Sequence, residues 1–260
     1  MNPSSSVVWG ARPFQAPGSV GKAVRLLLVV EAILGVVSSV ATFVASRGET
    51  FTRFPEIVPG TRQRISPFGF YPQPMGTVVW IASLVSTGTV ICWLVWQHRA
   101  QANVWAIPSQ VNPDITPGWA VGWWFVPVAN LVMPFLAVRE LSLRSADAAG
   151  STRSALILWA WWLCWVGAMV IAAIGSVSTV VAFFSRFADA IDTSTGAIDA
   201  IVVPMDAVRT GVQLLAVGYL VRAVAACLAY TVVTGIERDQ TVIANTPPAI
   251  PARPDVVLSS

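Results

Sequence analysis

The sequence predicts an all-α integral membrane protein, a polytopic helical bundle with four spanning helices and one Pro-kinked segment that is embedded in the membrane or interfacial. Hydrophobic residues make up 55% of the 260 residues and charged residues only 11%, whereas soluble domains carry about 25% charged residues. The chain also contains 12 tryptophans, a residue enriched at membrane–water interfaces. The apolar residues form long continuous runs, a pattern typical of buried or spanning helices.

Four of these runs are long enough to cross a membrane, because a hydrocarbon core of about 30 Å needs about 20 helical residues. We expect a single membrane domain over residues 23–238, with spanning helices at about residues 23–45, 77–97, 155–184 and 207–234. The run at 155–184 exceeds the minimum length, so it either tilts or extends beyond the membrane.

The segments outside these runs are polar or rich in proline. Residues 1–22 have no long apolar core, which predicts a disordered Pro/Ser-rich tail rather than a signal peptide. Residues 239–260 are Pro-rich and are expected to be a disordered tail as well. Between the runs, residues 46–76 predict a loop with little regular structure. Residues 185–206 predict a solvated acidic connection, either a short helix or a loop.

The kinked segment, residues 119–144, begins within the stretch "PGWAVGWWFVPVANLVMPFLAVRE". Pro127 and Pro134 each remove a backbone donor and are expected to kink a helix. Carbonyl groups freed in hydrocarbon need another partner, and we expect the side chain of Asn130, between the two prolines, to supply one. The segment could instead cross the membrane, which would give five spans.

Counting lysine and arginine does not decide between the two topologies. Either one places nine basic residues on one side and six on the other, when Arg222 in the last apolar run is left out. We favour four spans because of the prolines. Both termini would then lie on the side with more positive charge, which is the cytoplasmic side.

Two charged residues, Glu31 and Arg222, lie deep inside apolar runs. Glu31 is about 12 Å from the start of the first predicted span and Arg222 about 18 Å from the end of the last. Intramembrane ions normally face the interior and pair, so we predict a Glu31–Arg222 ion pair. It is either a structural link between helices or part of a proton or ion pathway.

The motifs of common enzyme classes are absent from the sequence. There is no HExxH, GxSxG, P-loop or GxGxxG motif. The three cysteines lie inside apolar runs and the single histidine follows the second run, so neither predicts a metal site. We therefore expect no catalytic residues, no metal and no cofactor. The tryptophans are expected at the interface or in helix packing, or, as an alternative, around a hydrophobic groove lined by Trp119, Trp123 and Trp124.

The central stretch resembles the signature of an uncharacterised actinobacterial membrane family, domain of unknown function 4328. The likeness covers about residues 25–242. It implies a bacterial inner-membrane protein with a cytoplasmic N-terminal tail, and it implies no activity or substrate. The resemblance is carried by a Gly–Trp-rich run, a Pro-x-Ala-Asn-Leu step, a second proline and an Arg–Glu pair, which include Trp119, Trp123, Trp124, Pro127, Asn130, Pro134, Arg139 and Glu140.

We expect a structural or regulatory module of the bacterial plasma membrane that binds a protein or lipid partner. Besides the lipid bilayer, its partner would be another membrane protein or a second copy of the chain. No nucleic acid is expected, because there is no long basic run. A small transporter or channel subunit that uses Glu31, Arg222 and Asn130 is the alternative, and a membrane enzyme is the third possibility.

Overall fold

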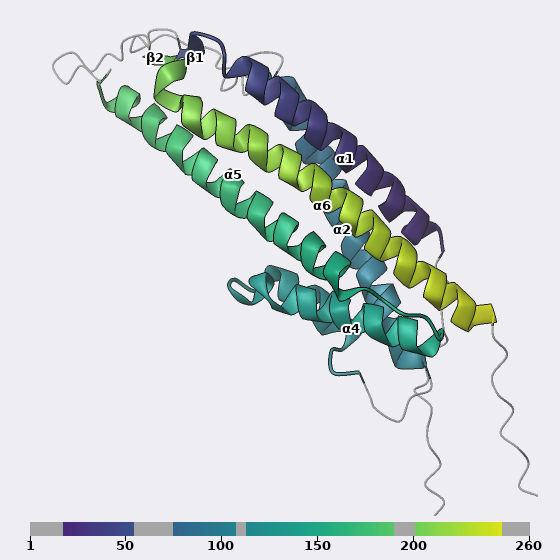
Figure 1. Ribbon diagram of the computed structural model, residues 1–260. Helices are drawn as coiled ribbons and strands as arrows, with labels where there is room; N and C mark the ends of the chain where they lie inside the picture. The colour runs from purple at the N-terminus through teal and green to yellow at the C-terminus, as the bar shows by residue number, and fades with distance from the viewer. Residues whose placement is uncertain (1–17, 55–74, 108–112, 190–200, 246–260) are drawn as a thin grey trace, which may run out of the picture.

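The structure is a computed structural model that describes residues 18–54, 75–107, 113–189 and 201–245. Its main elements are four long helices (Figure 1): α1 (Ser19–Ala45), α2 (Met75–Ala106), α5 (Ala155–Asp189) and α6 (Met205–Asn245). In the described part of the chain these four helices are long and apolar enough to cross a membrane. The predicted fold class, an α-helical membrane bundle with four spans, is therefore confirmed.

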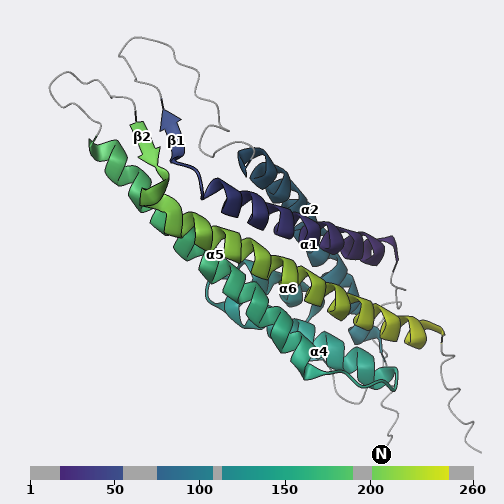
Figure 2. The ribbon, with the colours of Figure 1, turned by 45° about the horizontal axis from the view of Figure 1, so that its top comes forward.

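The four helices pack in the spatial order α2–α1–α6–α5. Helix α6 packs along both α1 and α5, and α1 packs along α2, whereas α2 and α5 have little direct backbone contact. Figure 2 shows α1, α6 and α5 side by side, with α2 beyond α1. Large side chains bridge between α2 and α5 instead, as where the ring centroids of Trp93 and Trp161 lie 5.5 Å apart.

Small residues allow the helices to approach closely along α6. A Cβ atom added to Gly35 of α1 would lie 2.9 Å from the Cβ of Ala223. A Cβ added to Gly175 of α5 would lie 2.7 Å from the carbonyl oxygen of Gly211. In membranes, helix association depends on such close packing, because lipid tails are as apolar as the helices themselves.

A short antiparallel ribbon joins the two long connections at one end of the bundle. Strand β1 (Thr50–Phe54) pairs with β2 (Ile201–Pro204), and the backbone N–H of Met205 donates to the carbonyl of Glu49. The sequence predicted neither strand, because both are too short to produce an alternating pattern. Residues 55–74 and 190–200, the remainder of the two predicted connections, lie outside the described residues.

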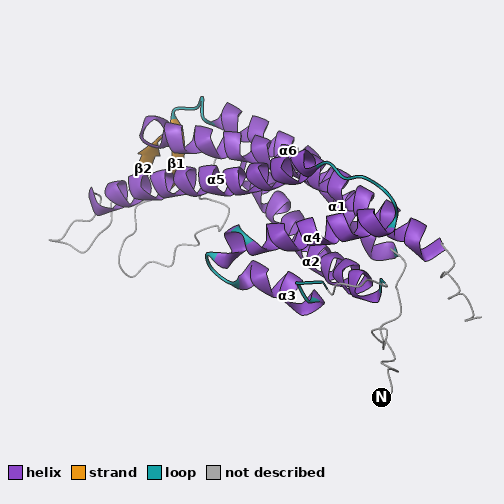
Figure 3. Cartoon of the chain, turned by 60° about the horizontal axis from the view of Figure 1, so that its bottom comes forward, coloured by secondary structure: helices purple, strands orange, loops and turns teal. Residues whose placement is uncertain are grey.

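The predicted kinked segment is a helical hairpin. It consists of α3 (Pro117–Gly122), the 3₁₀ turns η1 (Trp123–Phe125) and η2 (Ala129–Leu131), and α4 (Met133–Ala148). The chain reverses between the two turns, where Val128 adopts φ 68°. Figure 3 shows α3 and α4 beside α2. With 6 and 16 residues, α3 and α4 are too short to cross a membrane, so the five-span alternative is not supported.

The prediction that both prolines kink a helix is wrong. Pro127 lies in the turn between η1 and η2, where no helix is interrupted. Pro134 lies in the first turn of α4, where a backbone N–H has no partner within the helix. The two prolines therefore mark the boundaries of short helices.

The helices extend beyond the predicted spans. Helix α6 continues to Asn245, into the predicted C-terminal tail, because Asp239 and Gln240 are buried at 1% and 2% exposure. The start of α1 and the end of α6 lie at the same end of the bundle (Figures 1 and 2). We call this the terminal end. Residues 1–17 and 246–260, which include most of both predicted tails, lie outside the described residues.

Candidate functional site

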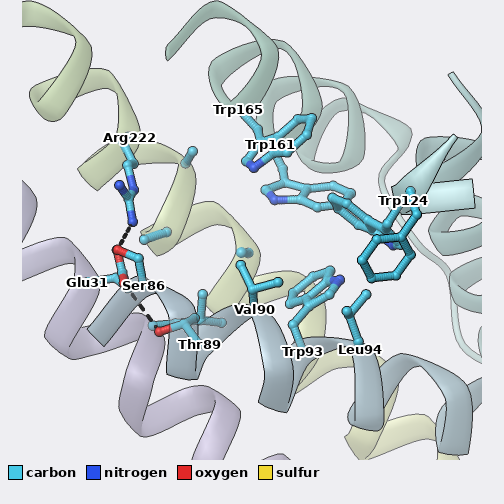
Figure 4. Close-up of a pocket in the computed structure, with 15 residues that line it drawn as sticks. Glu31, Ser86, Thr89, Val90, Trp93, Leu94, Trp124, Trp161, Trp165 and Arg222 are labelled. Carbon is cyan, nitrogen blue, oxygen red and sulfur yellow. Dashed lines mark hydrogen bonds and ion pairs between the residues drawn. The ribbon is translucent and has the colours of Figure 1, made fainter. Parts of the chain in front are cut away.

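An ion pair links α1 and α6 in the middle of the bundle. The Nη2 atom of Arg222 lies 2.6 Å from Oε2 of Glu31, so the predicted pair is present (Figure 4). Two side chains of α2 complete the cluster. Arg222 Nη2 also donates to the hydroxyl of Ser86, and the hydroxyl of Thr89 donates to Oε1 of Glu31 at 3.3 Å.

The packing of α1 on α6 explains why these two charges meet. The helices are antiparallel neighbours, so residues at similar depths face each other. Gly35, one turn after Glu31, contacts Ala223, the residue after Arg222. This close approach brings both charged side chains within hydrogen-bonding distance, which is the arrangement that ions need inside a membrane.

A cavity of about 300 Å³ begins at this ion pair and continues toward the terminal end. Its polar end is formed by the four residues of the cluster, and its other end is mainly aromatic (Figure 4). Residues of α1, α2, η1, α5 and α6 line it: Leu28, Glu31, Ser86, Thr89, Val90, Trp93, Leu94, Trp124, Phe125, Trp161, Trp165, Arg222, Ala225, Ala226 and Ala229.

Four tryptophans, Trp93, Trp124, Trp161 and Trp165, form the aromatic end. The rings of Trp124 and Trp165 meet edge to face, with centroids 5.3 Å apart and an interplanar angle of 87°. The indole N–H groups of Trp93 and Trp124 donate to the same atom, Gln97 Oε1, at 3.1 and 2.8 Å. Gln97 is fully buried and does not line the cavity, so these two rings present carbon atoms to the cavity.

Part of the cavity lining is exposed at the surface of the protein. Val90 of α2 and Phe125 of η1 are 55% and 71% exposed, and the side chain of Arg222 is 40% exposed. The cavity is therefore not fully enclosed, and the exposed lining at Val90 and Phe125 is apolar.

Only one of the three signature tryptophans belongs to the cavity. Trp124 lines it, whereas Trp119 and Trp123 do not. They stack on each other with centroids 4.6 Å apart, and Trp119 is 53% exposed. This cavity is therefore not a groove lined by all three tryptophans.

Asn130 does not have the predicted role. Its side chain donates no hydrogen bond to a carbonyl among the described residues, and its oxygen Oδ1 is buried without a partner. Backbone amides satisfy the carbonyls of the turn instead: Asn130 N donates to Val126 O at 2.9 Å and Ala129 N to Pro127 O at 2.8 Å. The indole of Trp162 also donates to Leu131 O at 3.3 Å. The reversal of the chain supplies these partners, so the Asn130 side chain is not needed for them.

Glu140 holds the start of the hairpin in place. Its carboxylate accepts hydrogen bonds from the backbone N–H groups of Asp114 and Ile115 at 2.6 and 3.1 Å, and it pairs with Arg144 at 3.1 Å. Arg139, the other charged signature residue, is exposed on α4. Of the Arg–Glu part of the signature, Glu140 therefore holds the chain before the hairpin, and Arg139 is exposed at the surface; neither residue lines the cavity.

Sequence reasoning missed a second group of charged pairs at the terminal end. Asp239 pairs with Arg153, and Glu237 pairs with Arg25 at 2.9 Å. Nearby, Asn103 donates to Gln240 at 2.8 Å. One signal could have revealed that α6 extends this far, because no glycine or proline occurs between Ile236 and Pro247.

The fold and the cavity define a polytopic α-helical membrane protein with a cavity between its spanning helices. The chain belongs to the family described as Domain of unknown function (DUF4328), whose family model matches residues 73–238. This range contains α2, the hairpin, α5 and most of α6. Arg222 therefore lies inside the matched range and Glu31 outside it. Comparison with curated proteins and with solved structures gives no match.

Proposed function

We propose that this protein is a membrane module that binds a small amphiphilic lipid in the cavity, and that it is not an enzyme. The observation that carries the proposal is the composition of the cavity, which joins a hydrogen-bonding cluster at Glu31 and Arg222 to a wall of four tryptophans. Ligand sites are typically apolar cavities with a few well-placed polar groups. The exposed lining residues Val90 and Phe125 support entry of the ligand from the bilayer.

The proposed location is a bacterial plasma membrane, with both termini in the cytoplasm. The family resemblance supports the bacterial membrane. In the four-span topology the sequence assigns nine lysine and arginine residues to the side of both termini and six to the other, which supports the orientation by the positive-inside rule. In this orientation the aromatic part of the cavity lies in the cytoplasmic half of the membrane.

The proposal is tested by identifying what co-purifies with the full-length protein. Val90→Trp places a large side chain at the cavity opening, where Val90 is 55% exposed, and Ala225→Phe fills the interior. Val177→Trp on the outer surface of α5, where Val177 is 62% exposed, is the matched control. Native mass spectrometry should detect a small hydrophobic molecule on the unaltered protein and the control, but not on the two filled variants.

Identical bound species on all four proteins would contradict the proposal, because the cavity would then not be the site of binding.

Transport is the second candidate function, and one observation favours it. The Glu31–Arg222 pair lies near the middle of both spanning helices and borders the cavity, a position where ionisable residues often serve ion or proton pathways. The sequence analysis predicted that a transporter would also use Asn130, but this residue is not among those that line the cavity. A proton flux into protein-containing liposomes that Glu31→Gln abolishes would favour transport over binding.

A further inference from the structure

We infer that the ligand of the cavity is a neutral amphiphile whose head is a flat ring bearing a carbonyl oxygen. This inference rests on the proposed function, and it names the chemical class of the ligand. Three features of the cavity lead to it: the hydrogen-bonding capacity of Arg222, the balanced charge of the ion pair, and the orientation of the tryptophans.

Arg222 has donor capacity that the protein does not use. In the described part of the chain its hydrogen bonds to Glu31 and Ser86 both involve Nη2. A guanidinium group carries five N–H donors, and the Arg222 side chain is 40% exposed. Because Arg222 lines the cavity, the remaining donors are available to an oxygen acceptor on a ligand.

The charge at this end of the cavity is already balanced. The Glu31 side chain is 8% exposed and pairs with Arg222, so the cluster carries no net charge that would attract a charged ligand. A carboxylate or phosphate bound here would place an additional, unpaired charge in a region of low dielectric, which is costly. A neutral acceptor such as a carbonyl oxygen can accept from Arg222 without this penalty.

The tryptophans at the aromatic end of the cavity favour a ligand whose head is a flat ring. The N–H groups of Trp93 and Trp124 are occupied by Gln97, so these indoles offer carbon surface and few hydrogen bonds. Flat rings pack on indoles in stacked or edge-to-face geometries that contribute beyond simple burial. A volume of about 300 Å³ lies at the small end of ligand cavities. It therefore suits the head of the ligand, while an alkyl tail leaves past Val90 and Phe125.

The test compares three probes on the full-length protein in lipid nanodiscs, with binding measured by depletion of free probe against empty nanodiscs. The first probe, 2-decyl-1,4-naphthoquinone, has the ring, the carbonyls and the tail. The second, 2-decylnaphthalene, lacks the oxygens, and the third, decanoate, is anionic and has no ring. We expect the quinone to bind saturably and about tenfold more tightly than decylnaphthalene, the effect of one hydrogen bond to a charged donor. We expect decanoate to bind weakest.

Variants assign this binding to the cavity. The double variant Glu31→Gln with Arg222→Gln keeps the site neutral and removes the guanidinium. On this variant the quinone and decylnaphthalene should therefore bind with equal affinity. The control Val177→Trp should leave the order of the three probes unchanged. Because the probe series is measured on the unaltered protein, the order of affinity of the three probes does not depend on the folding of any variant.

The outcomes separate the two proposals. Tighter binding of decanoate than of the quinone, lost in Val90→Trp, would overturn the inferred ligand class and leave the proposed function standing. Equal binding of the quinone and decylnaphthalene would have the same consequence. If all three probes bind and neither Val90→Trp nor Ala225→Phe weakens their binding, both the proposed function and the inferred ligand class are overturned.

Discussion

The two ion-pair regions along α6 use the same chemical groups in opposite surroundings. In the middle of the bundle, the Glu31–Arg222 pair borders a cavity, and Arg222 is 40% exposed. At the terminal end, the Arg153–Asp239 pair is packed against backbone, with side chains 16% and 1% exposed. Glycine makes this tight packing possible, because the guanidinium of Arg153 occupies the space where Gly235 lacks a side chain. The arginine of the terminal pair is thus enclosed by the fold, whereas the arginine of the central pair remains accessible from the cavity.

The largest expected effect tests the tightly packed terminal pair. Arg153→Ala leaves the buried carboxylate of Asp239 without its main partner, which should lower the free energy of unfolding by about 3–5 kcal/mol. Arg238→Ala is the matched control, since Arg238 lies 3.9 Å from the same carboxylate but is 72% exposed, and it should cost about 0–1 kcal/mol. Denaturant unfolding of the purified protein in detergent measures both. Equal losses would show that burial does not distinguish the two arginines.

The pair at the cavity should be less costly to break, because Arg222 keeps Ser86 and access to the cavity. Glu31→Gln should lower the free energy of unfolding by about 1.5–3 kcal/mol, the usual contribution of hydrogen bonds to charged groups. The double variant Glu31→Gln with Arg222→Gln should recover part of this loss, because it leaves no unpaired charge in the bundle. A double variant that is no more stable than Glu31→Gln would argue against a stabilising pair.

The next prediction concerns Gly21, a glycine at the terminal end that leaves space for the side chain of Glu237. A methyl group at Gly21 would collide with the carboxylate of Glu237, which must then move relative to Arg25. Gly21→Ala should therefore lower the free energy of unfolding by about 1–3 kcal/mol, as overpacking does. Gly88 of α2 has open space at its added Cβ, so Gly88→Ala should instead raise stability by about 0.5–1 kcal/mol. Thermal unfolding in detergent distinguishes the two directions, and the same sign for both would contradict this account.

The smallest expected effect concerns the aromatic end of the cavity. Trp124→Phe removes the 2.8 Å hydrogen bond to Gln97 while keeping an aromatic ring, and it should cost about 0.5–1.5 kcal/mol. Trp119→Phe is the control, because Trp119 lies outside the cavity and is 53% exposed. Chemical unfolding followed by circular dichroism avoids relying on tryptophan fluorescence. A larger loss in Trp119→Phe would show that the exposed stack matters more than the buried network.

The sequence predicts well those features that depend on hydrophobicity over many residues. The four spans follow from apolar runs, and the Glu31–Arg222 pair follows from the cost of placing single charges inside them. The cavity is not predictable in this way, because its tryptophans come from α2, η1 and α5 and no spacing within one helix brings them together.

The errors occur where hydrophobicity is uninformative. Residues 119–138 of the hairpin carry no charged side chain and resemble a span. The reversal at Val128 uses a positive φ on a residue that is not glycine, which no turn motif indicates. The predicted C-terminal tail began at Asp239 because residues 239–260 are Pro-rich, although the first of these prolines is Pro247. In the structure Asp239 and Gln240 are buried within α6 and bonded to Arg153 and Asn103, which are distant in the sequence.

The length of α6 has a mechanical consequence for the whole molecule. Its 41 residues span about 60 Å, about twice the hydrocarbon thickness of a bilayer. This single rod contacts the β1–β2 ribbon at one end, carries Arg222 in the middle, and holds the terminal ion pairs at the other end. A tilt of α6 about its middle would therefore displace groups at both ends of the bundle at once and move Arg222 least.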